Sequence, residues 1–206
     1  MTRPASGGVT RVVLATRNAG KVVELRRLLA PHGVELVGLD DVPAYEPGPE
    51  TAPDFAGNAL AKAREAVQHT GLPAVADDSG LEVDALNGMP GVLSARWAGR
   101  HGDDRANLEL VLGQLADVPD ERRGARFVCA AAYALPDGRE EVVEGTVRGV
   151  LLRAPRGTGG FGYDPLFVPH GSDRTTAEMT AEEKDAISHR GEAFRALAPR
   201  LVAALG

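Results

Sequence analysis

The sequence predicts an α/β protein with a mixed β-sheet flanked by helices. Short apolar segments alternate with segments whose apolar residues recur at helical spacing, which is the order typical of βα units. Further along, the extended segments 126–135 and 140–152 flank Asp137-Gly138, a pair typical of an antiparallel hairpin turn. Because βα units give parallel strands and a hairpin gives antiparallel ones, we expect both directions in one sheet.

The N-terminal part predicts a strand, a helix and a second strand. The apolar run 12–15 ends in the polar turn 16–21, as a buried strand does where it enters a loop. Residues 22–29 place valine and leucine on one helical face, and Gly33 follows where such a helix ends. The apolar segment 34–37 then predicts the second strand.

A proline-rich loop separates this part from the next helix. Residues 40–53 hold four prolines and several acids, so we expect an exposed loop. Asp54 is a suitable N-cap for a helix over 55–69, and Gly71 stands where a left-handed C-terminal cap is common. The apolar segment 73–76 predicts another short buried strand.

The remaining elements follow from turn and helix signals. A turn-rich segment (87–102) precedes a helix (103–115) and the hairpin. A glycine-dense loop (157–165) and a strand (166–168) follow. A capping box from Thr180 to Glu183 then begins a helix that runs towards His189, and a last helix ends at Leu205.

Length and composition limit the class of protein. With 206 residues and 43% hydrophobic content, the chain is expected to form one domain over 1–206, with residues 1–10 as a flexible extension. A formal net charge of −6 disfavours nucleic-acid polymers as partners. The single Cys129 excludes an intramolecular disulfide, and no signal core or membrane-length apolar stretch is present. We therefore expect a cytoplasmic protein without membrane association.

The turn 16–21 is the first candidate for chemistry. A strand–loop–helix junction presents free backbone N–H groups and the positive end of a helix to an anion. Gly20 allows close approach of a phosphate, and Lys21 adds a full positive charge. Taken alone, the segment is better explained as an ordinary polar connection, because it lacks the glycine spacings of a Walker loop and of a dinucleotide-binding fingerprint.

Two adjacent carboxylates, Asp77 and Asp78, are expected at the end of the strand 73–76, before an extended pattern resumes at 81–83. Neighbouring strand residues point in opposite directions, so one carboxylate is expected to face a cleft and the other to anchor the turn. Magnesium takes one or two carboxylates and shares its other positions with water and phosphate. An Asx-type turn explains the same residues as well. Glu50 is a candidate second metal contact, with a solvated glutamate as its alternative.

Two further segments are candidates for binding a base or a phosphate. The loop residues Phe161 and Tyr163 offer rings that could stack on a base, while Asp164 or main-chain groups could read its edge. The alternative is that these rings fill the core. Lys184 and the pair His189-Arg190 would place two cations and an imidazole on one surface, which suits a phosphate or purine clamp or simply a solvated helix face.

Six segments follow one another along nearly the whole chain, from Val12 to Leu201. They are 15–21 (ATRNAGK), 58–63 (NALAKA), 76–81 (ADDSGL), 90–96 (PGVLSAR), 157–165 (GTGGFGYDP) and 183–191 (EKDAISHRG). In this order they resemble the bacterial inosine and xanthosine triphosphate pyrophosphatase family. The resemblance implies a homodimeric, elongated, two-lobed fold with a central substrate cleft. It also implies magnesium-dependent hydrolysis of a triphosphate to the monophosphate and pyrophosphate, with one Mg²⁺ ion per active site and Mn²⁺ as a substitute.

The resemblance also assigns roles by position. Asp78 matches a proton acceptor and metal ligand, while Lys62 and Glu50 are weaker matches, for a phosphate contact and for the metal. The matched substrate-binding positions are Thr16, Arg17, Asn18, Ala19, Gly20, Lys21, Ser79, Phe161, Gly162, Tyr163, Asp164, Lys184, His189 and Arg190. Two residues depart from the family pattern: Arg17 replaces a small residue, and Gly57 replaces an acid. If that acid helps to hold a metal, the chain must use Glu50, Asp77 or Asp78 instead.

The expected function is hydrolysis of ITP, dITP and XTP, which removes deaminated purines from the nucleotide pool. Asp78 and magnesium are expected to activate a water that attacks the α-phosphorus. Two alternatives stay open at this point. One is a related pyrophosphatase for pyrimidine or modified nucleotides, and the other is a non-catalytic nucleotide-binding module.

Overall fold

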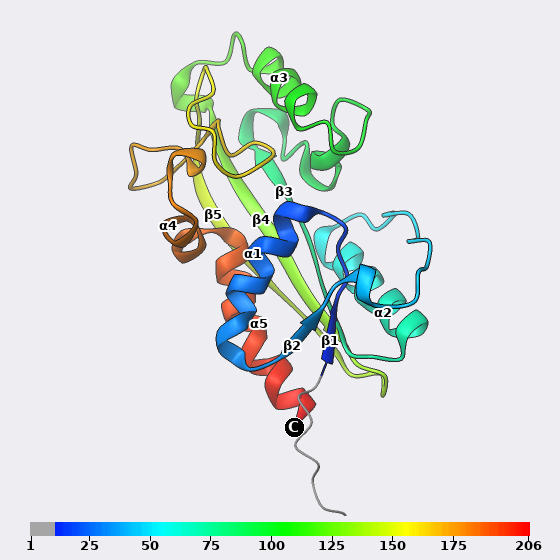
Figure 1. Cartoon of the computed structure of the whole chain (residues 1–206). Helices are drawn as coiled ribbons and strands as arrows, with labels where there is room; N and C mark the ends of the chain where they lie inside the picture. Colours follow the sequence, from blue (N-terminus) through cyan, green and yellow to red (C-terminus); the bar gives the residue numbers. More distant parts are fainter. Residues whose placement is uncertain (1–10) are drawn as a thin grey trace, which may run out of the picture.

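The computed structural model describes residues 11–206 as a six-stranded mixed sheet with helices on both faces (Figure 1). The predicted flexible extension, residues 1–10, lies outside the described residues. The strand order is β2-β1-β3-β4-β5-β6; β1 is parallel to β2 and β3, and the other pairs are antiparallel. The strands are β1 (Arg11–Leu14), β2 (Glu35–Val37), β3 (Ala74–Val83), β4 (Gly124–Ala134), β5 (Glu140–Leu151) and β6 (Phe167–Pro169). The mixed sheet that the sequence predicts is confirmed.

The helices begin and end close to the predicted signals. They are α1 (Ala19–Leu29), α2 (Phe55–Thr70), α3 (Asp104–Gln114), α4 (Ala181–Ile187) and α5 (His189–Leu205). The side chain of Asp54 accepts a hydrogen bond from the amide of Gly57 and caps α2, which ends at Gly71 with a positive φ of 67°. Thr180 and Glu183 form the expected capping box at α4. None of these helices is long and apolar enough to cross a membrane.

One predicted boundary is wrong. Asp77 and Asp78 do not end a strand, because β3 continues from Ala74 to Val83. Its antiparallel neighbour β4 pairs along the whole length, with Asp77 opposite Ala131 and Asp78 opposite Ala130. The strand that ends here is β1, which pairs with β3 only at Ala74 and Val75. The two carboxylates therefore lie in mid-strand, next to the point where the parallel neighbour stops.

The alternation of side chains along β3 divides the two aspartates between the faces of the sheet. Val75 packs with residues of α1 and α5, and Ala74 and Ala76 pack with residues of α2. Asp77 follows Val75 by two residues and so faces α1 and α5, whereas Asp78 faces α2. Figure 1 shows α1 and α5 together, with α2 displaced from them across the sheet.

The long strands continue beyond these helices into a second lobe around α3. Its core cluster joins Leu81 of β3, Phe127 of β4 and Phe167 of β6 to α3 residues such as Leu108 and Val111. In Figure 1 α3 lies at the opposite end of the molecule from the C-terminus, so the fold is elongated. The site residues of β3 lie between the two lobes.

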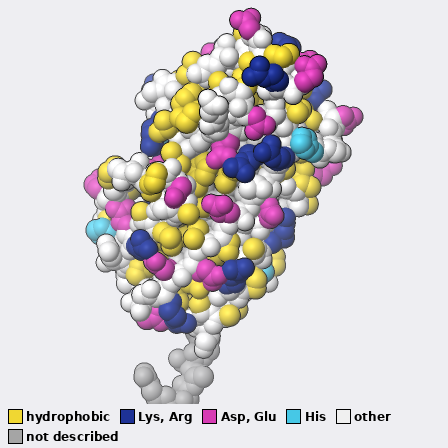
Figure 2. All heavy atoms as spheres, turned by 180° about the vertical axis from the view of Figure 1, so that it is seen from behind, with side chains coloured by type: hydrophobic (Ala, Val, Ile, Leu, Met, Phe, Trp, Pro, Cys, Tyr) yellow, Lys and Arg dark blue, Asp and Glu magenta, His cyan; other side chains and the backbone are white. Residues whose placement is uncertain are grey.

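Cys129 is buried as the sequence predicts. The thiol is fully buried in the cluster under α5, as expected of a small hydrophobe, and burial raises its pKa. Figure 2 shows acidic and basic side chains interspersed on the face opposite to Figure 1.

Candidate functional site

Asp78 stands at the centre of a charged cluster on the α2 face of the sheet. Its Oδ1 accepts a hydrogen bond from Nζ of Lys62 at 2.9 Å, and its Oδ2 accepts one from Nδ2 of Asn58 at 3.0 Å. Both donors belong to α2, four residues apart, so one helical face presents them to the strand. Burial raises the pKa of Asp78, although the ammonium groups of Lys62 and Lys21 oppose the rise. A buried carboxylate with a raised pKa is suited to accept a proton.

Glu50 reaches the same cluster from the proline-rich loop. Its Oε1 lies 2.6 Å from Nζ of Lys62, and its Oε2 lies 3.0 Å from Nη1 of Arg96. Burial by itself raises the pKa of Glu50, but Lys62 and Arg96 together hold it below its ordinary value. The solvated alternative for Glu50 is therefore wrong, because the side chain is half-buried and paired with two cations.

The loop that carries Glu50 is fixed at several points. Arg17 donates to the carbonyl of Tyr45 at 2.7 Å, and the Tyr45 ring stacks on His69 of α2 with centroids 4.5 Å apart. The amide of Gly48 donates to Glu65 at 2.7 Å. The segment is an exposed loop as predicted, but these contacts determine where Glu50 lies.

Asp77 is the centre of a second cluster, on the α1 and α5 face. Its Oδ2 lies 2.9 Å from Nζ of Lys21 and 3.2 Å from Nε of Arg190. Although burial alone raises the pKa of Asp77, Lys21 and Arg190 hold it well below its ordinary value. Asp77 is therefore a permanent anion that anchors two cations, and Asp78 is the carboxylate of the pair suited to proton transfer. The two side chains point in opposite directions as expected, but Asp77 binds cations where the sequence predicted that one aspartate anchors a turn.

Glu24 connects Asp77 to the C-terminal segment. It accepts from Nη1 of Arg190 and, at 2.9 Å, from Nζ of Lys184, which also donates to Asp164 at 2.6 Å. Glu24, Lys184 and Arg190 are all buried. Lys184, His189 and Arg190 do come together, but the prediction that they share a surface is wrong. Lys184 and Arg190 are buried because nearby carboxylates neutralise the positive charge of each side chain.

His189 begins α5 as a neutral imidazole. Burial first, and then the neighbouring Arg190 and Lys184, hold its pKa well below the ordinary value. Its ring stacks on Phe127, with centroids 4.8 Å apart. Within residues 11–206, its Nδ1 is one of two buried side-chain polar atoms without a hydrogen-bond partner, the other being Oδ1 of Asp77. Such an orphan is a candidate contact for a bound molecule.

The glycine-dense loop closes over these cations. The ring centroid of Phe161 lies 5.1 Å from Nζ of Lys184 and 5.6 Å from Cζ of Arg190. The ring of Phe161 also lies next to Gly20, because a Cβ added there would be 2.7 Å from a ring atom. A larger residue at Gly20 would displace the Phe161 ring, so glycine suits this position for packing as well as for approach to an anion.

Tyr163 and Asp164 have different positions from those predicted. The ring of Tyr163 packs in the core cluster of the α3 lobe, and its hydroxyl donates to the carbonyl of Ser94 at 2.8 Å. Stacking of this ring on a base is therefore a wrong prediction, and the core-filling alternative holds for Tyr163. Asp164 is buried and accepts from Lys184, Thr176 and the amide of Phe161, so its carboxylate shapes the loop.

The turn 16–21 has the predicted form of a helix N-terminus. Asn18 caps α1 by accepting from the amide of Lys21 at 3.0 Å, and Thr16 Oγ1 accepts from the amide of Asn18. Arg17, Asn18 and Ala19 are exposed. Ser79 lies under this turn and accepts from Nη2 of Arg190 at 2.8 Å. An anion at this position meets backbone amides and the Lys21 ammonium together.

Sequence reasoning missed three residues of the site, namely Glu24, Asn58 and Arg96. Glu24 lies in the predicted helix 22–29 but is not one of the valines and leucines of its apolar face, and only its spacing of three from Lys21 hints at a shared surface. Asn58 stands only in the segment 58–63 of the family resemblance, and Arg96 stands only at the end of the segment 90–96. The partner of Arg96 is 46 positions away, so no local pattern could reveal the pair.

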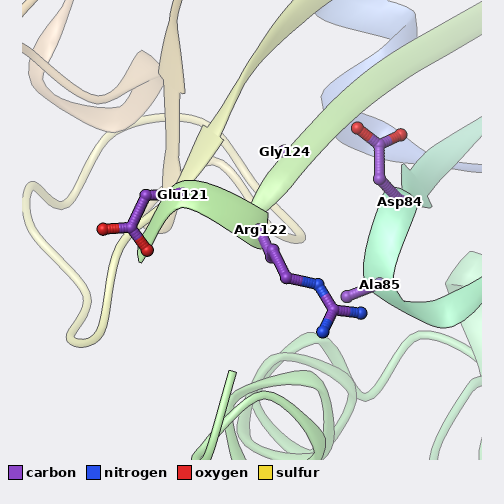
Figure 3. Close-up of a pocket in the computed structure, with 5 residues that line it drawn as sticks. All are labelled: Asp84, Ala85, Glu121, Arg122 and Gly124. Carbon is purple, nitrogen blue, oxygen red and sulfur yellow. The ribbon is translucent and has the colours of Figure 1, made fainter. Parts of the chain in front are cut away.

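A surface pocket of about 280 Å³ lies elsewhere, lined by Asp84, Ala85, Glu121, Arg122 and Gly124. Figure 3 shows these side chains around the start of β4, and none of the predicted site residues is among them.

Similarity to known proteins covers nearly the whole chain. Residues 12–200 match the model of the Ham1 family. A Streptomyces coelicolor protein named dITP/XTP pyrophosphatase is 63% identical over 200 residues, which are 96% of this chain and 100% of that protein. A solved nucleoside-triphosphatase / dITP/XTP pyrophosphatase from Mycobacterium abscessus is 63% identical with a TM-score of 0.76, covering 92% of this chain and 100% of that one. A HAM1 protein from Coxiella burnetii has a TM-score of 0.83 at 40% identity, covering 95% and 100%.

Proposed function

Because the chain belongs to the Ham1 family, we propose that it hydrolyses ITP, dITP and XTP to the nucleoside monophosphate and pyrophosphate. The names of relatives at 62–63% identity support this activity. The single observation that carries it in the structure is the pairing of Asp78 with Lys62, beside the helix N-terminus of α1 and Lys21. The ammonium groups of Lys62 and Lys21 both act on the carboxylate of Asp78, so the proposed general base lies near two cations.

Positive charges of the site are proposed to position the triphosphate. Residues 17–19, which are exposed at the N-terminus of α1, and the ammonium of Lys21 are proposed to bind phosphate oxygens, with Lys62 next to the reacting end. Asp77 keeps Lys21 in place through its 2.9 Å contact. Departing pyrophosphate gains negative charge, so cations fixed beforehand stabilise the transition state more than the ground state.

Asp78 is the proton acceptor in the proposed mechanism. A water lying between its carboxylate and the α-phosphorus loses a proton to Asp78 as the oxygen attacks, and pyrophosphate leaves. Asn58 holds the second carboxylate oxygen and so fixes the direction in which the first one points. The raised pKa keeps the proton affinity of Asp78 higher than that of an exposed aspartate.

Glu50 and Asp78 fit a Mg²⁺ ion, for which Mn²⁺ is a substitute. Within the described residues no group of three or more His, Cys, Asp or Glu side chains converges. Two carboxylates nevertheless share one cationic partner, and magnesium commonly takes one or two carboxylates together with phosphate oxygens. One ion per active site, when bound, supplies positive charge to the phosphate oxygens and lowers the pKa of water.

The purine is proposed to lie near Phe161, His189 and Arg190. The unpartnered Nδ1 of His189 supports this, because a buried imidazole nitrogen needs a partner that the protein does not supply. Hypoxanthine and xanthine carry a 6-oxo acceptor where adenine carries an amine, and a donor left unpaired by adenine costs binding energy. Lys184, Gly162 and the backbone of Tyr163 and Asp164 complete the proposed base end.

A homodimer and a cytoplasmic location remain parts of the proposal. Val23 on α1 and Ile187 on α4 are exposed apolar side chains, and α1 packs against α4. These two side chains are proposed to form part of the contact between the subunits. The acidic net charge of −6 favours a small-molecule substrate over a nucleic-acid polymer.

A substrate panel tests the proposed function. Pyrophosphate release is measured from ITP, dITP, XTP, GTP, ATP, dCTP and dUTP, with magnesium and with a chelator. Metal-dependent release from ITP, dITP and XTP far above that from the other nucleotides is the expected result. Preferential cleavage of the pyrimidine nucleotides would favour the pyrimidine pyrophosphatase, and binding without cleavage would favour the non-catalytic module.

A further inference from the structure

The ammonium of Lys62 lies between two carboxylates from distant parts of the chain. Nζ is 2.6 Å from Oε1 of Glu50 and 2.9 Å from Oδ1 of Asp78. It also donates to the backbone carbonyl of Asp77 at 3.1 Å. The three oxygens come from the proline-rich loop and from two successive residues of β3, and Lys62 is the group that joins them.

These three oxygens form the kind of donor set that a hard divalent cation takes. Carboxylate and carbonyl oxygens are the protein ligands of magnesium and manganese, and both carboxylates are the proposed metal ligands. An ammonium and a divalent ion cannot share the position, because two positive charges a few ångströms apart repel strongly where solvent is partly excluded. Binding of the ion therefore requires the ammonium to move.

Arg96 and Lys62 contact different atoms of Glu50. Its Nη1 donates to the other carboxylate oxygen, Oε2, at 3.0 Å, and its Nη2 donates to the backbone carbonyl of the same residue at 3.3 Å. One guanidinium thus holds both the side chain and the main chain of Glu50. Its contact leaves Oε1, the oxygen that pairs with Lys62, to another cation.

Arg96 is itself held by the fold. It ends the 3-10 helix Gly91–Arg96, in which Ser94 Oγ accepts from the amide of Leu81 at 2.9 Å. Gly80 permits this close approach, because a Cβ there would lie 2.5 Å from Ser94 Oγ. The 3-10 helix that carries Arg96 is therefore anchored to β3, and the guanidinium holds Glu50 by two hydrogen bonds.

We propose that Lys62 is a resident counter-cation, which occupies the position between Glu50 and Asp78 and leaves it when the divalent ion binds. Arg96 is a positioning residue that keeps Glu50 in place during this exchange. The proposal rests on the proposed function, since it concerns the metal site of that reaction. It also explains why one lysine can pair with both carboxylates and still serve as a phosphate contact. Once displaced, the ammonium is free to turn to the triphosphate.

The exchange makes an unusual prediction, namely that loss of a catalytic-site lysine tightens metal binding. Lys62→Met and Arg96→Met each remove one positive charge from Glu50 while keeping an unbranched side chain. Binding of Mn²⁺ is measured without nucleotide, from the loss of the free-ion signal in electron paramagnetic resonance. Circular dichroism checks that each variant is folded, and Lys62→Gln is the second variant at that position.

The expected Kd for Mn²⁺ falls at least about tenfold in Lys62→Met, because a like charge has left the site. It rises severalfold in Arg96→Met, because Glu50 is no longer held. Asp78→Asn is expected to weaken binding in the wild-type and the Lys62→Met background alike, which locates the ion. An equal decrease of the Kd for Mn²⁺ in Lys62→Met and Arg96→Met would show a general electrostatic effect and overturn the exchange. So would an unchanged or higher Kd in Lys62→Met and Lys62→Gln.

Failure of the proposed function is separable from failure of this inference. Turnover of dITP is decided by the substrate panel, and Mn²⁺ binding is decided without any substrate. A protein that cleaves dITP but whose Lys62→Met variant binds Mn²⁺ no more tightly keeps its function and loses the exchange.

Discussion

At the scale of single residues, the account depends on two neighbouring aspartates with opposite environments. Asp77 is surrounded by cations that lower its pKa, and Asp78 has a raised pKa because burial outweighs its two lysines. The alternation of a β-strand, which puts them on opposite faces, is what allows adjacent carboxylates to differ in this way.

Asp78→Asn should lower kcat by at least about 100-fold, because an amide cannot accept the proton from water. The side chain keeps its size and one oxygen, so the melting temperature should change little. Steady-state release of pyrophosphate from dITP measures the loss. The matched control is Asp137→Asn in the exposed hairpin turn, which should retain full turnover; retention of turnover by Asp78→Asn would remove it from the mechanism.

Glu24→Gln should destabilise the protein by about 3 kcal/mol at neutral pH, because it leaves Lys184 and Arg190 short of a buried anion. The ion pairs lower the pKa of Glu24 in the folded state, although burial alone raises it. Such a group stabilises the fold above its unfolded pKa, near 4.5, and the stabilisation is lost as pH falls through the lower folded pKa.

The difference in free energy of unfolding between wild type and Glu24→Gln should therefore shrink as pH falls from 6 to below 4. Urea denaturation at each pH measures it. A difference that stays constant with pH would mean that the carboxylate charge of Glu24 does not stabilise the fold.

Some residue roles could be predicted from sequence and some could not. The turn 16–21 and Asp78 belong to local patterns, so strand, loop and helix signals indicate them. The ring of Tyr163 and the burial of Lys184 depend on partners such as Ser94 and Glu24, which are 69 and 160 positions away. Periodicity carries no information about such contacts.

At the scale of elements, helices and strands were predictable because their caps and turns are local. Asp54, Gly71 and the capping box at Thr180 all act as the sequence indicates. The end of β3 was not predictable, because polar residues usually end a strand. Here the full-length pairing with β4 keeps Asp77 and Asp78 in the sheet, and that pairing is long-range.

The contact between β5 and α5 gives a prediction at this scale. A Cβ at Gly145 would lie 2.5 Å from the amide nitrogen of Ala193 and would collide with the carbonyl oxygen of His189. Gly145→Ala should therefore lower the free energy of unfolding by about 1–3 kcal/mol through overpacking. It should also raise KM, because α5 carries His189 and Arg190.

Gly113→Ala in α3 is the matched control for this substitution, since a Cβ there meets nothing within 4 Å. Helix propensity predicts that it stabilises the protein by about 0.5–1 kcal/mol. Denaturation curves of both variants measure the free energy of unfolding, and the kinetics of dITP hydrolysis measure KM. Equal behaviour of the two variants would contradict the close packing of β5 on α5.

At the scale of the whole molecule, we propose that residues 11–206 form one cooperative domain. Strands β3, β4 and β5 run through both lobes and contribute to the core clusters of each. A lobe cannot unfold without breaking pairs that belong to the other, so a single transition is expected.

The chain offers one natural reporter in each lobe. Trp97 is the single tryptophan and packs in the α3 lobe, and Cys129 is the single cysteine and lies buried under α5. Tryptophan fluorescence and thiol labelling during urea denaturation should give the same midpoint. Two separated midpoints would show that the lobes unfold independently.

The central claim is that Asp78 directs water to the α-phosphorus of a deaminated purine nucleotide. Hydrolysis of dITP in ¹⁸O-labelled water, followed by mass spectrometry of both products, tests it most directly. We expect one ¹⁸O atom in dIMP, unlabelled pyrophosphate, and labelled product from Asp78→Asn at least about 100-fold more slowly. Label in pyrophosphate, or release of inorganic phosphate, would place the attack on another phosphorus and contradict the mechanism.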